Sequence, residues 1–152
     1  MQSLVNELVK QATETGMTVN DRKTKEMLIG SILKDKPLSV NFSGTFVERV
    51  TTFKLLEVHV ANNLKWTQQV DAISLKVSSR LYLLKQLKRS GAGPEDLLCY
   101  YITVVRPVLE YACPVWHLSL TAAQTKTLES LRQRAMKIIF PAVKDYTLAD
   151  LC

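Results

Sequence analysis

The chain is 152 residues long, and 47% of its residues are hydrophobic and 22% are charged. These proportions are typical of a folded globular protein and exclude a disordered chain. There is no run of about 18 uncharged apolar residues, so we expect no membrane-spanning helix. The N-terminal residues also lack the basic and then apolar pattern of a secretory signal, which leaves the cytoplasm or the nucleus as the expected compartment.

The net charge of +6 is distributed unevenly along the chain. Residues 1–65 carry nine basic and seven acidic side chains, whereas residues 66–140 carry ten basic and five acidic ones. A basic helical surface is typical of proteins that bind nucleic-acid phosphates, because each cation near a phosphate releases condensed counterions. A solvated basic surface without a ligand is the alternative interpretation.

The cysteines and histidines indicate no disulfide framework and no metal site. Cys99, Cys113 and Cys152 are odd in number and far apart, which is typical of reduced thiols. Cys99 and Cys113 fall within apolar helical patterns, so we expect both thiols to be buried. The two histidines, His59 and His117, are accompanied by no Cys-x-x-Cys pair, so the sequence offers no zinc site.

The N-terminal part of the chain predicts one helix and several short strands. Apolar residues at helical spacing predict an amphipathic helix over residues 3–15, which Gly16 ends. A polar turn then leads into a short strand that ends at Gly30. Further segments rich in Val, Phe and Thr predict a small antiparallel sheet with a hairpin turn at Ser43–Gly44. Its strands are expected at residues 38–42, 45–50 and 52–60.

From Trp66 onward the apolar residues recur every three or four positions, which predicts helices. The first helix begins after Trp66, and Pro94 starts the second at a position where proline is favoured. Pro107 removes a backbone donor from the second helix, so we expect a kink near Thr103 and an end near Cys113.

The third helix begins at a capping box formed by Thr121 and Gln124, and Pro141 ends it. The predicted fold class is therefore α+β. An N-terminal helix and a small antiparallel sheet occupy residues 1–65. A helical bundle of three long helices occupies residues 66–152.

The most informative motif spans residues 47–66. The pattern V-x-x-V-x-x-F-K-x-L-x-V runs from Val47 to Val58, and L-x-W follows at residues 64–66. It resembles the last palm strand of the reverse transcriptases of non-LTR (LINE-type) retrotransposons, where the chain enters the thumb. Residues 16–27, with G-M-x-x-N-x-x-K-T-K-E-M, resemble the segment after the catalytic hairpin of the same enzymes.

The helical half resembles the thumb of these enzymes, and the resemblance covers nearly the whole chain. The matching residues are Arg80, Leu81, Leu84, Leu87, Leu97, Tyr101, Pro107, Leu109, Tyr111, Trp116, Leu131, Gln133, Ala135, Ile138 and Ile139. The resemblance implies a late palm remnant followed by a thumb-like bundle. It also implies an RNA–DNA duplex or another nucleic acid as the partner.

Polymerase chemistry requires carboxylates that hold two Mg²⁺ ions. In the resembled enzymes these are two adjacent aspartates and a third aspartate on an earlier strand. No two aspartates are adjacent in this chain. We therefore expect a truncated or degenerate fragment of a reverse transcriptase that has no polymerase activity and no bound cofactor of its own.

The resemblance assigns two lysines to nucleic-acid binding. Lys23 corresponds to a lysine in the loop near the incoming triphosphate, and Lys54 lies in the strand that grips the primer end. A solvated turn lysine is the alternative interpretation of Lys23. Glu57 stands where the family has a glycine, and its side chain would hinder the approach of a nucleic-acid backbone.

The charge pattern predicts that the basic residues of the first long helix also contact nucleic acid. These are Lys76, Arg80, Lys85, Lys88 and Arg89. The third long helix carries further basic residues, Lys126, Arg132, Arg134 and Lys137. Three aromatic residues can stack on bases, but we expect them in the core: Tyr100, Tyr111 and Trp116.

The sequence also allows two alternative interpretations of the function. Residues 76–107 also resemble a helical region classed with the N-terminal part of an AlkB-type tRNA-modifying dioxygenase and methyltransferase. That chemistry requires a His-x-Asp…His iron triad, which His59 and His117 do not supply. The other alternative is a helical interaction module without a nucleic-acid role. It would bind a partner or self-associate through an exposed apolar face of the N-terminal helix, residues 3–15, where a palm would pack.

Overall fold

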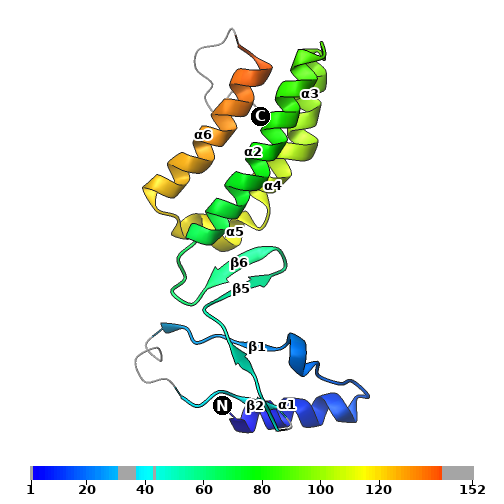
Figure 1. Ribbon diagram of the computed structural model, residues 1–152, viewed down its shortest axis with the longest axis vertical. Helices are drawn as coiled ribbons and strands as arrows, with labels where there is room; N and C mark the ends of the chain where they lie inside the picture. The colour runs from blue at the N-terminus through cyan, green and yellow to red at the C-terminus, as the bar shows by residue number, and fades with distance from the viewer. Residues whose placement is uncertain (1, 31–36, 43, 142–152) are drawn as a thin grey trace. The chain divides into compact units, whose positions relative to one another are not determined.

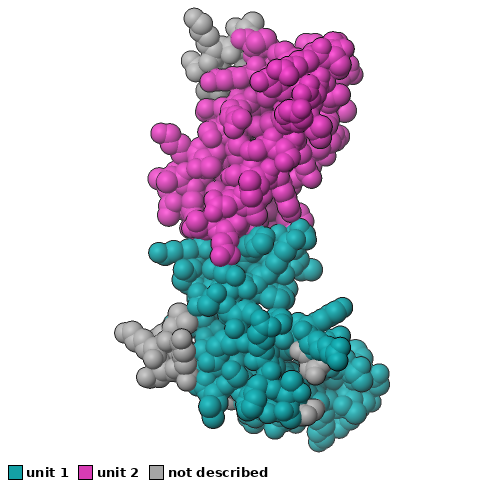
Figure 2. All heavy atoms as spheres, viewed as in Figure 1, with its two compact units in different colours: residues 1–65 teal, residues 66–152 magenta. Residues whose placement is uncertain are grey.

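The computed structural model describes residues 2–30, 37–42 and 44–141. It combines helices with small two-stranded sheets, as expected of the α+β class (Figure 1). The chain forms two compact units, Met1–Lys65 (unit 1) and Trp66–Cys152 (unit 2), which Figure 2 distinguishes by colour. In the described part of the chain, no helix has both the length and the apolar character that crossing a bilayer requires.

Unit 1 begins with helix α1, Gln2–Glu14. Gly16 follows it with a φ of 73°, the left-handed conformation with which many helices end. No residue of α1 is buried, and Leu4 and Leu8 are 68% and 60% exposed. The predicted amphipathic helix is present, but only part of its apolar face is covered.

The first strands of unit 1 form separate pairs, so the prediction of one antiparallel sheet is wrong. Strand β1 (Lys25–Glu26) pairs in parallel with β4 (Glu48–Arg49). Strand β2 (Asn41–Phe42) pairs antiparallel with β3 (Thr45–Phe46). A period of two identifies strand residues but not their partners, and here β4 pairs with a segment that precedes the β2–β3 hairpin.

The segment predicted as one strand over residues 52–60 is a hairpin of two strands, β5 (Thr52–Leu55) and β6 (Val58–Ala61). Leu56 and Glu57 form its turn with φ values of 46° and 67°. Two-residue hairpin turns of type I′ require positive φ at both positions, which is why glycine is favoured there. The glycine that the resemblance places at position 57 would therefore suit this backbone. In the β2–β3 hairpin, Ser43 lies outside the described residues.

Polar side chains connect the short elements of unit 1. The side-chain amide of Gln2 donates to the Asn41 carbonyl (2.7 Å) and accepts from the Asn41 amide (2.9 Å). Arg49 binds the buried Glu26 carboxylate at 3.2 Å and donates to the Pro37 carbonyl at 2.8 Å. Among the residues of unit 1 that the structure describes, the buried apolar ones are Leu28, Val40, Val47, Val58 and Ala61.

Unit 2 contains two long helices, α2 (Thr67–Arg89) and α6 (Ala122–Ile139). The predicted capping box at the start of α6 is confirmed, because the Gln124 amide donates to Thr121 Oγ1 (3.3 Å) and the Thr121 amide donates to Gln124 Oε1 (2.9 Å). The apolar stripes of both helices supply most of the core of unit 2. Its fully buried members include Val77, Leu84, Ala135 and Met136.

The second expected long helix is divided into α3 (Pro94–Tyr100), a π-helical segment η3 (Tyr101–Val105) and α4 (Arg106–Glu110). Pro107 has no N–H group, so the carbonyl of Thr103 cannot receive its usual α-helical hydrogen bond. The π-helical segment contains Thr103, and π-helical segments often occur where the regular ladder of α-helical hydrogen bonds is interrupted. A bundle of three continuous long helices is therefore not confirmed.

A left-handed residue, Ala112, follows this segment and leads into two short helices, α5 (Cys113–Trp116) and η4 (His117–Ser119). Trp116 is 1% exposed, and its indole N–H donates to the Tyr111 carbonyl at 3.0 Å. The predicted core position of Trp116 is thus confirmed.

Two expectations about burial are wrong. Cys99 is exposed, and Tyr111 is half exposed, although both belong to apolar stretches. The second helix is apolar on most of its circumference, so its sequence does not indicate which side meets the core. Cys113 and Tyr100 are partly buried.

Candidate nucleic-acid interface

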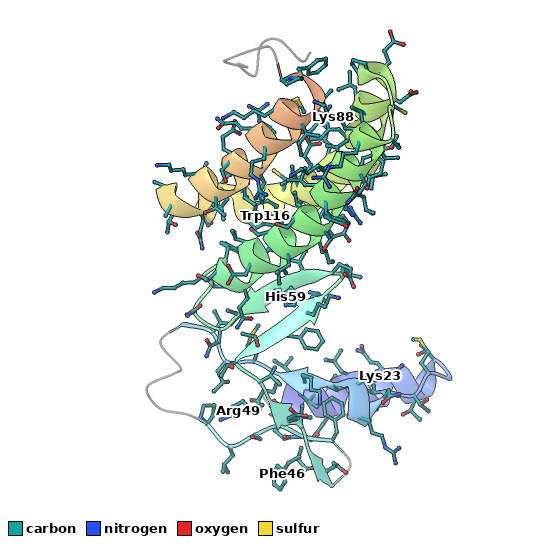
Figure 3. All side chains as sticks on the ribbon, turned by 45° about the horizontal axis from the view of Figure 1, so that its top comes forward. Lys23, Phe46, Arg49, His59, Lys88 and Trp116 are labelled. Carbon is teal, nitrogen blue, oxygen red and sulfur yellow. The ribbon has the colours of Figure 1, made fainter. Side chains whose placement is uncertain are left out.

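The two long helices of unit 2 lie against each other and run in the same direction (Figure 1). At their first turns, Gln124 Nε2 lies 3.4 Å from Thr67 Oγ1. Near their ends, the Lys88 ammonium donates to the carbonyl of Ile138 (Figure 3). The C-terminal ends of α2 and α6 therefore lie side by side.

The α3–η3–α4 segment packs on one side of this helix pair, with η3 against α2 and α3 against α6. Arg80 of α2 donates from Nη1 to the Val104 carbonyl of η3 at 2.6 Å. On α6, Arg132 lies near Tyr101 of η3: burial raises the pKa of the Tyr101 phenol, and the charge of Arg132 opposes that shift. Arg132 also binds the Glu129 carboxylate at 2.6 Å, and this hydrogen bond lowers the pKa of Glu129. Arg80 and Arg132 thus mark the η3 side of the two helices.

The five basic residues predicted on α2 do not share one face. Successive residues of an α-helix are turned by about 100°, so Lys76 is turned by only about 40° from Arg80 and lies toward η3. Lys85 and Arg89 are turned by about 140° and 180° from Arg80 and lie on the opposite side. The side chain of Lys88 is directed to α6 by its hydrogen bond. The structure therefore separates the predicted set into three orientations.

Three exposed basic residues of α6 lie on the side away from Arg132: Lys126, turned by about 120° near the start of the helix, and two residues near its end. Arg134 and Lys137 are turned by about 160° and 140° from Arg132. Arg134 and Lys137 therefore lie on the same side of the helix pair as Lys85 and Arg89. Because α2 and α6 end together, the four residues also lie at a similar height along the pair. We call these four residues the basic face. All four are exposed, and none of them forms an ion pair with another described residue.

Few carboxylates lie near the basic face. Asp71 is the one acidic residue of α2, and it precedes Lys85 by about 21 Å along the helix axis. Glu129, the one acidic residue of α6, is engaged by Arg132. Glu95 and Asp96 lie in the first turn of α3, where the helix dipole favours negative charge. No carboxylate of α2 or α6 therefore neutralises the basic face.

The remaining predicted site residues belong to unit 1. Lys23 ends the short 3₁₀ helix η1 (Asp21–Lys23) and is exposed (Figure 3), while its backbone amide donates to Asn20 Oδ1 at 3.1 Å. Lys54 lies on β5, and its ammonium is 2.6 Å from Glu57 Oε1. The charge of Lys54 is thus paired within its own hairpin.

Arg134 and Lys137 were missing from the nucleic-acid contacts predicted from the sequence. The signal available was strongest for Lys137, which is turned by about 120° from the buried Leu131 and by about 160° from the buried Ala135. Arg134 is turned by only about 60° from Leu131, so its spacing alone gives a weaker signal. The sequence gives no sign that these two residues lie next to Lys85 and Arg89, because that depends on the parallel packing of two helices far apart in the chain.

Possible metal ligands are dispersed in the described residues, where no three or more His, Cys, Asp or Glu side chains form a group that could hold a metal ion. His59 belongs to unit 1 and His117 to unit 2. No family model, curated protein or solved structure that was compared with this chain matches it.

Proposed function

We propose that unit 2 binds nucleic acid through the basic face, as a thumb-like fragment without polymerase chemistry. The observation that carries this proposal is the presence of four exposed cations on one side of two parallel helices. Phosphate binding by such cations is driven by the release of counterions. An RNA–DNA duplex is the first ligand to test, because the sequence resembles the thumb of LINE-type reverse transcriptases.

In this proposal α2, the α3–η3–α4 segment and α6 act together as a thumb-like bundle. Arg80 and Lys88 stabilise this bundle, because each donates a hydrogen bond to a backbone carbonyl of a neighbouring segment. A hydrogen bond from a charged donor stabilises a fold by about 1.5–3 kcal/mol. The cations available to a ligand are then those of the basic face.

The helix dipole offers a simpler explanation for part of this charge. Cations in the last turn of a helix are stabilised by about 0.3–1 kcal/mol without any ligand. Arg89 and Lys137 lie in the last turns of α2 and α6, so the dipole accounts for them. Lys85 and Arg134 lie before those turns, where the effect has fallen off. These two residues favour phosphate binding over helix stabilisation alone.

A pair of charge-matched variants of the full chain tests the proposal. One variant carries glutamine at the four basic-face positions. The other carries glutamine at Lys10, Lys23, Lys54 and Lys76, which are exposed cations elsewhere. Each variant lowers the net charge from +6 to +2. The duplex affinity of each is measured by fluorescence anisotropy between 50 and 200 mM salt, a range over which phosphate contacts are strongly salt-dependent.

The basic-face variant is expected to bind about 100-fold or more weakly at the lowest salt, with a salt slope shallower by about three to four. The control variant is expected to keep most of the affinity. Equal losses in both variants would identify a nonspecific effect of net charge and refute the proposal. A loss confined to the control would refute the basic face as the contact and move it to the other exposed cations, Lys10, Lys23, Lys54 and Lys76.

Self-association through α1 is a second candidate function. It is favoured by the exposure of Leu4 and Leu8 on a helix that has no buried residue. We propose that a second copy of the chain covers this face. Light scattering after size-exclusion chromatography is expected to show a concentration-dependent dimer, which Leu4→Gln/Leu8→Gln abolishes. A monomer at all concentrations would refute it.

A further inference from the structure

Helix α2 exposes two large side chains on the same side as the basic face. Leu75 is 72% exposed and Tyr82 is 62% exposed. They are turned by about 140° and 160° from Arg80, and so they lie away from η3. Tyr82 precedes Lys85 by about one helical turn and Arg89 by about two. An exposed aromatic ring therefore lies directly beside two cations of the basic face.

The position of Tyr82 is not explained by packing within unit 2. The buried stripe of α2 is complete without it, since Val77, Leu81 and Leu84 occupy the core positions around it. The Tyr82 hydroxyl forms no hydrogen bond with any other described residue. An aromatic residue that is left in water next to cations has the two features with which proteins hold single strands: a ring for stacking and charge for the backbone.

We infer that Tyr82 is a stacking platform for an unpaired base, and that the phosphates of the same strand lie on the basic face. This inference rests on the proposed nucleic-acid binding. Stacking on a side chain requires a base whose face is free, and the bases inside a continuous duplex are covered by their neighbours. The ligand class is therefore a nucleic acid with a single-stranded segment, such as an overhang at the end of a duplex.

Charge complementarity selects this ligand over an apolar partner. The exposed row on α2 runs from Leu75 through Tyr82 to Arg89, one residue every two turns, so it becomes basic at one end. A hydrophobic partner seated on Tyr82 would have to cover Lys85 and Arg89 as well, and burying unpaired charges is costly. A nucleic acid can stack a base on Tyr82 and place its phosphates beside Lys85 and Arg89.

The test compares two probes of equal length, single-stranded oligo(dT) and a blunt duplex, on the full chain. Tyr82→Ala is expected to weaken binding to oligo(dT) about tenfold and binding to the duplex less than about twofold. Leu75→Ala is the matched control, because it also shortens an exposed side chain of α2, and it is expected to leave both affinities within about twofold. Tyr82→Trp is expected to retain binding, and its fluorescence is expected to be quenched by oligo(dT) but not by the duplex.

Two results would overturn the inference: an unchanged affinity of Tyr82→Ala for oligo(dT), or equal losses for both probes. Absence of quenching in Tyr82→Trp would also overturn it, and this readout does not depend on the stability of the alanine variant. If the variant lacking the basic face binds both probes as well as the unmodified chain, the proposed function itself fails. A loss in that variant, together with an unchanged Tyr82→Ala, refutes the stacking platform alone.

Discussion

The two units reach their folds by different means. Helices α2 and α6 present long apolar stripes to each other, so that Val77, Leu84 and Met136 are completely buried. In unit 1 most strands are two residues long, and α1 buries no residue at all. Such short elements have little apolar surface to share, and polar pairs such as Glu26 with Arg49 connect them instead. Apolar packing holds unit 2 together, whereas unit 1 combines a smaller apolar core with specific polar contacts.

This difference bears on function. A helical unit whose core is filled by its inner stripes can carry charged and aromatic residues on its outer sides without loss of stability. The residues proposed to bind nucleic acid lie on such outer sides of α2 and α6. Substitutions can therefore separate residues that hold the fold from residues that bind a ligand.

The largest expected effect is the loss of a core aromatic residue in unit 2. Trp116→Ala is expected to lower the free energy of unfolding by about 3–5 kcal/mol, because it removes a fully buried side chain and leaves a cavity. The neighbouring Val115 is well exposed, and Val115→Ala is expected to change stability by less than about 0.5 kcal/mol. Urea unfolding followed by circular dichroism measures both. Equal stabilities would show that packing does not dominate unit 2.

The corresponding change in unit 1 removes a polar partner. Arg49→Met is expected to cost about 2–3 kcal/mol, because the buried Glu26 carboxylate loses its counterion. Hydrogen exchange of the Val50 amide, which bonds to the Glu26 carbonyl at 2.8 Å, reports this opening. Neutralising both partners in Glu26→Gln/Arg49→Met is expected to restore part of the loss. Unchanged exchange in Arg49→Met would contradict the importance of polar contacts in unit 1.

Two arginines of α2 separate structure from binding within one helix. Arg80→Met is expected to cost about 1.5–2 kcal/mol, because the Val104 carbonyl loses a charged donor, and to leave the salt slope of duplex binding unchanged. Arg89→Met is expected to cost at most about 0.5 kcal/mol and to reduce that slope by about one. Thermal unfolding and binding titrations are made on both variants. A reduced salt slope in Arg80→Met would place this residue among the ligand contacts.

A small gain in stability is expected at the β5–β6 turn. Glu57→Gly is expected to raise the free energy of unfolding by about 0.5–1 kcal/mol, because a glycine adopts the φ of 67° without the strain of a side chain. Its exposed ion pair with Lys54 is worth less than this gain. Glu57→Ala loses the same ion pair but keeps the strained backbone, so it is expected to be less stable than the glycine variant. The reverse order would show that the turn is not strained.

Local features of the sequence predicted local structure well. The capping box at Thr121 and Gln124 involves residues three positions apart, and both of its hydrogen bonds are present. Pro107 likewise marked the interruption of the second helix, because its missing N–H acts on the preceding turn. Features that depend on distant segments were not predicted. The pairing of β1 with β4 is one example, and its parallel direction has no sequence signal of its own.

The candidate site shows the same limit. The charges of α2 and α6 were visible in the sequence, and so was the turn of about 100° between successive residues. The orientation of these residues depends on the α3–η3–α4 segment, which packs beside α2 and α6 and accepts the Arg80 hydrogen bond at Val104. Lys85 and Arg89 were predicted as contacts, while Arg134 and Lys137 emerged only from the packing of α6 beside α2.

The amide of Gln2 has a consequence for how copies of this chain meet. The outer edge of a strand carries free backbone donors and acceptors, which invite another chain to extend the sheet. At Asn41 both of these groups are bonded to the Gln2 side chain, at 2.7 and 2.9 Å. Gln2 thus acts as a one-residue substitute for a neighbouring strand. Pairing of another strand with the β2 edge at Asn41 therefore requires that the Gln2 side chain be displaced.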